Sequence, residues 1–407
     1  MSRVFMPRRP GDWTERSWRR VAFFAHANEV GHLSTVLMQK RAEEYGIEWP
    51  ESGSDNPGIL PWLSFPVVPP AHSGAEPVWC DFYVVMENAS VFLKRALKRD
   101  DDTAYRWVEA GALLALSEAQ ADGVPLTIGW GAYTKVATNH GVRFLERHPD
   151  LQDQLSTTHG DAGPVGLLRQ AIRLAGVAPG FRVSVLGAYG AIGAVISRAL
   201  VALEAGQITL IGREDKEGEI KNRERLERLA TSVFGLVPKH QATEVLIHQD
   251  NTTACKDHRS QLVIVATSGA PMLPDHVLPG TLILDLTTPA ACQPGHNWQD
   301  RLVLTTGCGE FSQVVVPRNF GDIAGVNILD VGAGGDRIIW GCKGETITRS
   351  AFGWHGHLVG QAFPLGEVDW CDRHCALVGL GPQPPVSFDV PVSHREVREF
   401  VARNRDN

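Results

Sequence analysis

Residues 182–193 read RVSVLGAYGAIG, and the rest of the chain is organised around this stretch. Residues 183–186 are a short apolar run rich in β-branched side chains, which is typical of a buried strand. Three glycines follow, and apolar residues then recur at helical spacing as far as Leu203. A second apolar run occupies residues 208–211. The order strand, turn, helix and strand predicts a βαβ unit.

The three glycines have the spacing G-x-x-G-x-x-G, a variant of the dinucleotide-binding turn. We expect Gly187 to allow a sharp turn, Gly190 to let the backbone approach a pyrophosphate, and Gly193 to let the helix lie close to the sheet. The alternative is a glycine-rich turn in another kind of α/β domain. The cofactor-binding residues predicted here are Gly187, Tyr189, Gly190, Ala191, Ile192, Gly193, Arg213, Ala266 and Thr267.

Further apolar runs support the dinucleotide-binding interpretation. They lie at residues 243–247, 262–266, 281–285 and 302–304. Continuous apolar runs of this length are typical of strands buried on both faces of a parallel sheet. The second strand of the βαβ unit ends in Gly212-Arg213, and Arg at this point favours the 2′-phosphate of NADPH. Glu214 and Asp215 follow directly and would bind a ribose hydroxyl of NAD if Arg213 points elsewhere.

Length and charge narrow the class of protein. The chain has 407 residues, enough for two domains, and its net charge of -7 does not indicate a nucleic-acid partner. No apolar run approaches the roughly 20 residues of a transmembrane segment. Residues 21–25 follow two arginines, as in an export signal, but Asn28 and Glu29 end the run too soon. We therefore expect a cytoplasmic protein.

The seven cysteines are an odd number in a chain without a secretory signal, so disulfides are not expected. Cys371 and Cys375, with His374 between them, come nearest to the spacing of a metal site. No second pair of Cys or His lies at a distance that would complete four ligands. Free thiols and no metal are therefore predicted.

Four segments are predicted along the chain. Residues 1–20 are a basic, proline-interrupted arm, and residues 21–177 are the first part of a substrate or catalytic domain. Residues 178–310 form the dinucleotide-binding domain, and residues 311–407 return to the substrate domain. The proline- and glycine-rich residues 50–74 are expected to be irregular surface chain. The predicted fold class is α/β, with a Rossmann-type doubly wound parallel sheet inserted between the segments of a second α/β domain.

Two polar loops in the N-terminal half are candidate substrate contacts. Residues 127–134 (TIGWGAYT) are a strand end that runs into small residues, and such ends commonly line ligand sites in α/β folds. Residues 156–161 (STTHGD) form the second loop. Both could equally be ordinary turns. The substrate residues predicted from them are Tyr133, Thr134, Thr157 and Thr158.

Cys342 is the candidate nucleophile. It lies beside Lys343 near the start of a helical pattern, and a thiol at a helix N-terminus with a cationic neighbour has a lowered pKa. The alternative, for any one of seven cysteines, is a buried structural thiol.

The sequence around Cys342 resembles the cyanobacterial long-chain acyl-(acyl carrier protein) reductase family. Glu345 follows after three residues, and Gly353-Trp354-His355 complete the pattern C-x10-G-W-H. Other blocks are similar to that family in the same order, at low identity. They are Gly31-His32-Leu33-Ser34, Gly131-Ala132-Tyr133-Thr134, Thr157-Thr158, Arg169-Gln170, the glycine turn at 187–193 and Val265-Ala266-Thr267-Ser268.

The resemblance implies NADPH-dependent reduction of an acyl thioester to an aldehyde, through an acyl-enzyme on Cys342. The acyl donor would be an acyl carrier protein or coenzyme A, and an aldehyde-consuming enzyme would take the product. His32 joins the substrate residues. His355 is the first candidate for holding the oxyanion, with backbone amides as the alternative. A core position packed against Trp354 is an equal alternative for His355.

The chain departs from the family where an acyl chain or carrier would lie. The family segment G-N-T-H-T-A is replaced by residues 159–163 (HGDAG), and Gly344 is expected to interrupt the helix after the cysteine. The acyl group therefore stays open.

Two other functions stay open. One is a non-catalytic NADP-binding partner protein whose thioester pocket has decayed. The other is a shikimate-type dehydrogenase, which requires a Lys–Asp pair in the N-terminal half that the sequence does not reveal.

Overall fold

The computed structural model describes residues 18–27, 59–98, 102–212, 219–248, 253–267, 271–287, 290–312, 337–360 and 363–405. The chain forms two compact units. The first comprises Met1–Gly163, Glu310–Phe363 and Arg373–Gly381. The second comprises Pro164–Gly309, Pro364–Asp372 and Pro382–Asn407. The expectation that residues 311–407 return as a whole to the substrate domain is therefore wrong, because their last 26 residues belong to the nucleotide-binding unit.

The first unit is built on a six-stranded sheet with the order β14-β5-β4-β1-β3-β2. Neighbouring strands are parallel except for β2, which is antiparallel to β3. The strands are β1 (Arg19–Ala27), β2 (Ile59–Val67), β3 (Val78–Asn88), β4 (Leu126–Trp130), β5 (Leu155–Thr158) and β14 (His357–Leu358). The helices are η2 (Ala71–Ser73), α3 (Ala89–Leu97), α4 (Thr103–Asp122), α5 (Thr134–Ala137), α6 (Val142–Arg147), η3 (Pro149–Leu151) and α11 (Gly341–Ala351).

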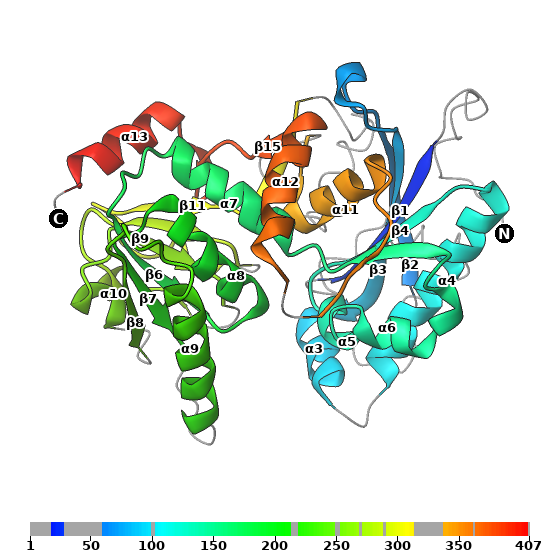
Figure 1. Ribbon diagram of the computed structural model, residues 1–407, viewed down its shortest axis with the longest axis horizontal. Helices are drawn as coiled ribbons and strands as arrows, with labels where there is room; N and C mark the ends of the chain where they lie inside the picture. Colours follow the sequence, from blue (N-terminus) through cyan, green and yellow to red (C-terminus); the bar gives the residue numbers. More distant parts are fainter. Residues whose placement is uncertain are drawn as a thin grey trace. The chain divides into compact units, whose positions relative to one another are not determined.

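Alternation along the strands gives this sheet two covered faces. Phe24, Tyr83 and Trp130 belong to the core shared with α3 and α4, whereas α11 lies on the opposite face (Figure 1). A Cβ on Gly129 would lie 2.4 Å from Oγ1 of Thr346 in α11. Glycine at this position therefore lets α11 lie close against β4.

Two expectations about the N-terminal half are wrong. Residues 19–20 belong to β1 rather than to an arm, and buried Arg20 pairs with Asp81 (Nε to Oδ2, 2.5 Å), Glu118 and Asp122. Residues 59–67 form β2 within the segment expected to be irregular. Prolines made that segment look irregular, but an edge strand tolerates proline because one side of it donates no ladder hydrogen bonds.

The second unit has the predicted dinucleotide-binding architecture. Its six parallel strands have the order β8-β7-β6-β9-β10-β11, which in chain order is 3-2-1-4-5-6, the Rossmann arrangement. The short strands β16 and β17 extend the β11 edge in antiparallel orientation. The strands are β6 (Arg182–Leu186), β7 (Gln207–Ile211), β8 (Glu244–His248), β9 (Leu262–Val265), β10 (Leu282–Asp285), β11 (Leu302–Thr305), β16 (Val386–Ser387) and β17 (Val390–Pro391).

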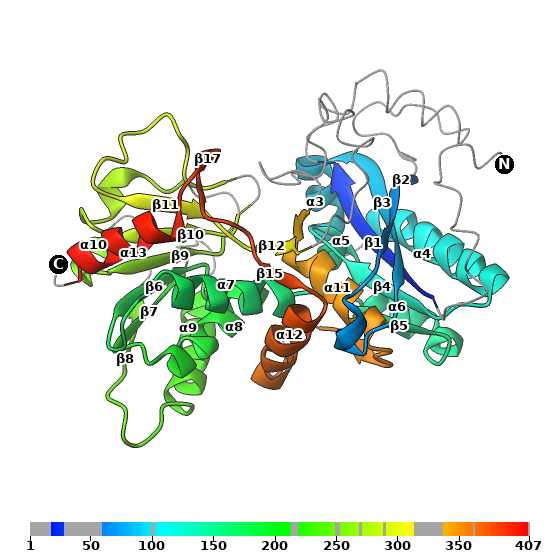
Figure 2. The ribbon, with the colours of Figure 1, turned by 90° about the horizontal axis from the view of Figure 1, so that it is seen from above.

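Helices cover both faces of this sheet. α8 packs on β6 and α9 on β7 and β8, while α10 contributes Ala254 and Cys255 to the core on the other face (Figure 2). The helices of this unit are α8 (Ala191–Ala199), η4 (Val201–Leu203), α9 (Glu219–Phe234), α10 (Ala254–Asp257), η5 (Pro274–His276) and α13 (His394–Arg403). The doubly wound fold predicted from the sequence is therefore confirmed.

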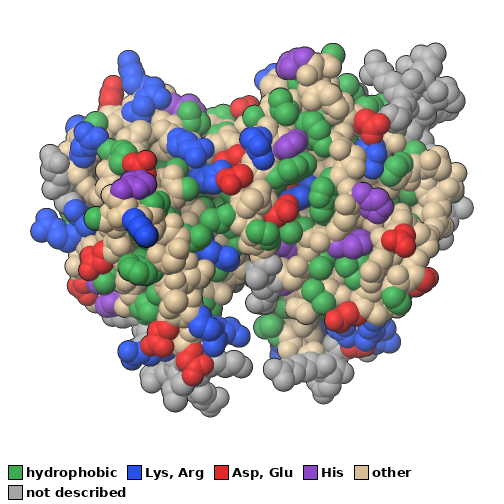
Figure 3. Space-filling model, in the orientation of Figure 1, with side chains coloured by type: hydrophobic (Ala, Val, Ile, Leu, Met, Phe, Trp, Pro, Cys, Tyr) green, Lys and Arg blue, Asp and Glu red, His purple; other side chains and the backbone are tan. Residues whose placement is uncertain are grey.

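Four elements pass from one unit into the other along the chain. They are α7 (Ala162–Leu174), β12 (Cys308–Phe311), α12 (Leu365–Leu377) and β15 (Leu380–Pro382). β12 also pairs with β13 (Ile338–Trp340) and β15 in a small third sheet. Basic and acidic side chains are interspersed on the face shown in Figure 3. Within the described ranges, no helix is both long and apolar enough to cross a membrane.

Candidate active site

The candidate site lies where the parallel strands of the first unit end. β4 ends at Trp130 and leads into α5, and the neighbouring β5 ends at Thr158 and leads into residues 159–161. Because parallel strands end at the same edge of a sheet, the two loops are neighbours. They bring together Lys135 of α5 and Asp161, which are 26 positions apart in the sequence.

Lys135 and Asp161 form a buried ion pair. The Lys135 Nζ donates a hydrogen bond to Oδ1 of Asp161, and only 8% of Lys135 and 1% of Asp161 are exposed. Nδ1 of His159 and Nδ1 of His140 lie 3.2 Å and 3.7 Å from the other carboxylate oxygen, Oδ2. The ion pair is therefore held in place within the protein, with the imidazoles of His140 and His159 beside its carboxylate.

The two charges hold each other ionised in spite of burial. Burial alone would raise the pKa of Asp161, but Lys135 and the two histidines hold that pKa well below its ordinary value of 3.8. Burial alone would lower the pKa of Lys135, but the Asp161 carboxylate offsets this and the pKa is raised above 10.5. At neutral pH the site therefore holds one ammonium and one carboxylate.

The short helix α5 is held by a strained backbone on both sides. Ala132 (φ 45°), Asn139 (φ 49°) and His140 (φ 52°) all adopt left-handed conformations, which are uncommon for residues with a Cβ. Thr134 Oγ1 donates to the carbonyl of Gly131 at 2.6 Å and fixes the entry to the helix. Strain of this kind persists only where the surroundings impose it, and it is concentrated at functional sites.

Cys342 lies against the loop that carries Asp161. It is the second residue of α11, and a Cβ on Gly160 would come within 2.7 Å of the Cys342 Cβ. Burial raises the pKa of the Cys342 thiol, and the Lys135 ammonium offsets only part of that effect. The predicted position at a helix N-terminus is confirmed, whereas the predicted lowering of the pKa is wrong.

Lys343 is not the main cationic neighbour of this thiol. Its Nζ lies over the ring of Phe82, 4.5 Å from the centroid, and lowers the thiol pKa less than Lys135 does. Adjacency in sequence was misleading because successive residues on a helix point in different directions. All seven cysteines are free. In the parts of the chain that the structure describes, no three Cys, His, Asp or Glu side chains are grouped to hold a metal ion.

α11 continues through Gly344, so the expected interruption is wrong. Glu345 of this helix accepts hydrogen bonds from Thr158 Oγ1 (2.9 Å), the Gly163 N–H (2.8 Å) and Arg349 Nε (2.7 Å). These bonds tie α11 to the end of β5 and to the start of α7. The Thr158 hydroxyl, predicted as a substrate contact, is therefore occupied within the protein.

His355 is exposed and lies four residues beyond the last residue of α11. An α-helix rises about 1.5 Å per residue, so Ala351 at the end of α11 lies about 14 Å along the helix axis from Cys342. His355 is therefore not placed to hold an oxyanion on Cys342, and its exposure also excludes the core position. Trp354 packs instead against the guanidinium of Arg349, 4.6 Å from the ring centroid.

The remaining predicted substrate residues have mixed surroundings. Tyr133 stacks on His26 with ring centroids 4.8 Å apart, and Thr134 is buried with its hydroxyl engaged as described above. Thr157 is buried, and its hydroxyl has no hydrogen-bond partner among the described residues. His32 and Arg213 lie outside the described residues.

The glycine turn of the second unit has the predicted form. Gly187 has φ 77°, and a Cβ there would lie 2.8 Å from the Ala266 carbonyl oxygen and from Cβ of Thr267. A Cβ on Gly193 would lie 2.2 Å from the Gly187 carbonyl oxygen. The close approach that Gly193 permits is thus to the turn itself, rather than to the sheet as predicted.

The start of α8 fits a pyrophosphate. Gly190 is the N-cap and offers no side-chain cap, so the N–H groups of Ala191, Ile192 and Gly193 have no intrahelical acceptor. These groups lie at the positive end of the helix dipole and attract an anion. Tyr189 reaches the end of β7, where a Cβ on Gly212 would lie 2.9 Å from its ring.

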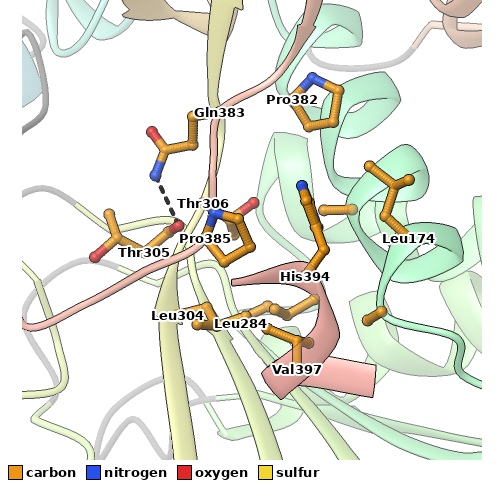
Figure 4. A pocket seen from close by; sticks show the side chains of 12 residues that line it. Leu174, Leu284, Leu304, Thr305, Thr306, Pro382, Gln383, Pro385, His394 and Val397 are labelled. Carbon is orange, nitrogen blue, oxygen red and sulfur yellow. Dashed lines mark hydrogen bonds between the residues drawn. The ribbon is translucent and has the colours of Figure 1, made fainter. Parts of the chain in front are cut away.

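A cavity in the second unit does not contribute to this chemistry. It has a volume of about 30 Å³ and lies between α7, α13 and the ends of β10 and β11 (Figure 4). Leu174, Leu284, Leu304 and Val397 make most of its lining apolar, and His394 is the one ionisable group in it. Such a volume holds a few waters at most.

Both loops of the candidate site were predicted from the sequence, but the pairing of their charged residues was not. Lys135 is the residue directly after the stretch at 127–134, and Asp161 is the last residue of the stretch at 156–161. Comparing the residues that follow two consecutive parallel strands would have paired them.

No known protein family matches the sequence, and no curated protein matches it. Similar solved structures include an Escherichia coli oxidoreductase/dehydrogenase of unknown specificity involved in membrane biogenesis (22% identity, 36% of this chain, 40% of that chain, TM-score 0.26). Another is quinate dehydrogenase from Corynebacterium glutamicum in complex with NAD (13% identity, 95% of this chain, 99% of that chain, TM-score 0.34). A third is shikimate 5-dehydrogenase from Listeria monocytogenes in complex with shikimate and NAD (12% identity, 74% of this chain, 89% of that chain, TM-score 0.34). This chain spans less than half of the first protein. With TM-scores below 0.5, the fold assignment rests on the strand order.

Proposed function

We propose that this protein is an NAD(P)-dependent oxidoreductase that reduces a carbonyl group, with Lys135 as the proton donor and Asp161 as its orienting partner. The observation that carries the proposal is the buried Lys135–Asp161 pair at the carboxyl edge of the first sheet. The shikimate-type alternative requires such a pair, and the sequence alone did not reveal it. Titratable groups with strongly shifted pKa values in a fixed geometry are typical of active sites.

The direction of the pKa shifts assigns the roles. A carbonyl oxygen gains negative charge as a hydride reaches its carbon, and a positioned acid must then supply a proton. The pKa of Lys135 is raised, so its ammonium is fully protonated at neutral pH and can donate to that oxygen. Asp161 stays ionised and holds the ammonium in place.

The glycine turn supports the cofactor class. A bound nicotinamide dinucleotide supplies the hydride, and the uncapped N-terminus of α8 would hold its pyrophosphate. NADPH is the finer proposal, and it rests on Arg213 at the end of the second strand.

A second candidate function is reduction of an acyl thioester to an aldehyde through Cys342, as the resemblance to the acyl-(acyl carrier protein) reductases implies. The observation that favours it is the contact of Cys342 with Gly160, within the field of Lys135. The thiolate would attack the thioester carbonyl, exchange one thioester for another, and release the carrier or coenzyme A thiol. The raised pKa of the thiol weighs against a preformed thiolate.

Two variants separate the candidates. In Lys135→Arg the guanidinium keeps the positive charge but does not release a proton, because it stays protonated in proteins. NAD(P)H oxidation should be followed with ketones and aldehydes and with acyl-coenzyme A thioesters, and the reverse reaction with quinate and shikimate. Carbonyl turnover that Lys135→Arg abolishes and Cys342→Ser retains supports direct hydride transfer. Thioester turnover with a covalent acyl group, lost in Cys342→Ser, supports the second candidate.

A further inference from the structure

Glu345 is a buried carboxylate to which neither candidate reaction gives a role. It is the fifth residue of α11, three positions after Cys342, and it is completely buried. Its Oε1 accepts hydrogen bonds from Oγ1 of Thr158 at 2.9 Å and from Nε of Arg349 at 2.7 Å. Its Oε2 accepts from the backbone N–H of Gly163 at 2.8 Å. Both oxygens of this carboxylate are therefore engaged within the protein.

Two of these bonds bracket the segment that carries Asp161. Thr158 is the last residue of β5, and Gly163 is the second residue of α7. Asp161, whose carboxylate accepts from Lys135, lies between them. One carboxylate of α11 therefore holds both ends of residues 158–163, which we call the Asp161 loop. A short segment fixed at both ends to the same group has few conformations open to it.

The glycines of the Asp161 loop lie close against the same helix. A Cβ on Gly160 would lie 2.7 Å from the Cys342 Cβ, and a Cβ on Gly163 would lie 2.9 Å from the Glu345 Cβ. The Thr158 hydroxyl, which donates to Glu345, also accepts from the Gly160 N–H at 3.0 Å. The loop therefore packs on the N-terminal part of α11 without room for a side chain at either glycine.

We propose that Glu345 is a positioning residue, which fixes the Asp161 loop on α11 and thereby holds the Asp161 carboxylate against the Lys135 ammonium. The inference rests on the proposed function for the role of Lys135 as proton donor. Glu345 acts through Asp161, because its own oxygens are bonded to the loop and to Arg349. A displacement of about 1 Å at a catalytic group can lower a rate by about 10²-fold.

The two ends of the loop can be released separately. In Glu345→Gln the amide oxygen can keep the bonds of Oε1, but the amide nitrogen faces the Gly163 N–H, so two donors meet and the far end is released. Thr158→Val removes only the hydroxyl bonds and releases the near end, and Thr158→Ser restores the hydroxyl. Thr348→Val is the matched control, because the Thr348 hydroxyl is also buried in α11 and donates within that helix, to the Gly344 carbonyl at 2.8 Å.

The first readout is the single-turnover rate of NADPH oxidation with a ketone that the wild type reduces, measured together with NADPH affinity and melting temperature. Glu345→Gln and Thr158→Val should each lower this rate by at least about tenfold with NADPH affinity unchanged. Thr158→Ser should recover most of the loss, and Thr348→Val should keep the wild-type rate. Wild-type rates in both loop variants, or an equal loss in Thr348→Val, would overturn the proposal.

The second readout follows Lys135 without turnover and separates positioning from a structural role. Burial alone would lower the pKa of Lys135, and the Asp161 carboxylate makes the largest contribution in the opposite direction. Thr158→Val removes no charge, so a lower pKa of Lys135 in this variant reports that Asp161 has moved away from the ammonium.

In protein with ¹³C-labelled lysines, the Cε signal that Lys135→Arg removes gives this titration. Its midpoint should lie at lower pH in Thr158→Val than in the wild type, Thr158→Ser and Thr348→Val. A midpoint that Thr158→Val leaves in place would show that the loop does not depend on its bond to Glu345, and the positioning role is then wrong. If the midpoint falls but the wild type reduces no ketone, the proposed function fails and the positioning of Asp161 by Glu345 is supported.

Discussion

At the scale of single residues, the proposed chemistry depends on one buried ion pair. Burying either the Lys135 ammonium or the Asp161 carboxylate alone would cost desolvation free energy, and the attraction between the two charges offsets that cost. The same pair shapes the environment of Cys342, because Lys135 lowers the thiol pKa while Asp161 raises it. A substitution at any one of these three positions should therefore change the electrostatic environment of the other two.

Removing one partner of the pair should be strongly destabilising. Lys135→Met leaves a buried carboxylate without its cation, which typically costs about 3–5 kcal/mol. The double variant Lys135→Met/Asp161→Leu removes both charges and should recover most of that loss. Urea unfolding of the wild type, the single variant and the double variant measures the difference. A single variant as stable as the wild type would show that the pair is not buried as described.

The pH dependence of that difference follows from the two pKa shifts. Asp161 has a lowered pKa, so its contribution is present above 3.8 and is lost as pH falls through the lower folded value. Lys135 has a raised pKa, so its contribution is present below 10.5 and is lost as pH rises through the higher folded value. The stability difference between wild type and double variant should therefore be constant from about pH 8 to pH 10, above the ordinary pKa range of imidazole. A fall in the difference within that range would contradict these assignments.

Cys342 should react slowly with alkylating agents. Its thiol pKa is raised by burial, and only the thiolate is nucleophilic. Lys135→Met removes the cation that most lowers this pKa, so the rate of alkylation by iodoacetamide at pH 8 should fall further. Mass spectrometry of the Cys342 peptide gives the rate, and Cys308, which is partly exposed like Cys342, is an internal control. Faster alkylation in the variant would show that Lys135 shields the thiol rather than stabilising its thiolate.

The sequence located the loops of this site but not the pair itself. Charge pairing across 26 residues depends on which strands are neighbours, and hydrophobic periodicity does not specify strand order. His355 was chosen from its motif, and the motif does not show that a whole helix separates it from Cys342. Cys342 was placed correctly at a helix N-terminus because that signal is local.

At the scale of elements, local patterns predicted the nucleotide-binding unit well. The glycine turn, β6 and α8 are consecutive in the sequence, and each was recognised from its own residues. β2 was missed because its prolines are tolerated only at a sheet edge, which is a property of the assembled sheet. Gly344 was expected to break α11, but the helix continues through it, and a Cβ there would lie 2.5 Å from Cδ2 of Leu380.

The turn should not tolerate a methyl group at Gly193. A Cβ there would lie 2.2 Å from the Gly187 carbonyl oxygen, so the turn and the start of α8 must move apart. Gly193→Ala should weaken NADPH binding by at least about tenfold, as expected when a phosphate-binding backbone loses its geometry. Gly366→Ala in α12 is the control, because a Cβ there meets nothing within 4 Å. Fluorescence titration with NADPH measures both, and equal affinities would show that this turn does not bind the dinucleotide.

At the scale of the whole molecule, the predicted dinucleotide turn and the proposed catalytic residues belong to different compact units. The Rossmann unit carries the dinucleotide turn, and the first unit carries Lys135, Asp161, His159 and Cys342. The order of the segments was predicted from the sequence. The return of residues 382–407 to the nucleotide-binding unit was not predicted. These residues form two short strands and one amphipathic helix, and the sequence of such elements does not show which unit they pack against.

The proposed preference for NADPH rests on Arg213. If Arg213 binds a 2′-phosphate, a charge-assisted hydrogen bond worth roughly 1.5–3 kcal/mol should favour NADPH over NADH by about ten- to a hundredfold. Arg213→Ala should remove that preference and leave NADH affinity unchanged. Titration of both dinucleotides measures it, and equal binding by the wild-type protein would contradict the preference for NADPH.

In the proposed reaction, Lys135 donates the proton during reduction of a carbonyl. The most direct measurement is the single-turnover rate of NADPH oxidation by Lys135→Arg, with a ketone that the wild type reduces. Arginine keeps the charge beside Asp161 but does not release a proton, so the rate should fall by about 10²–10⁴-fold while NADPH affinity and stability stay close to wild type. A Lys135→Arg variant that reduces the ketone at the wild-type rate would contradict the claim.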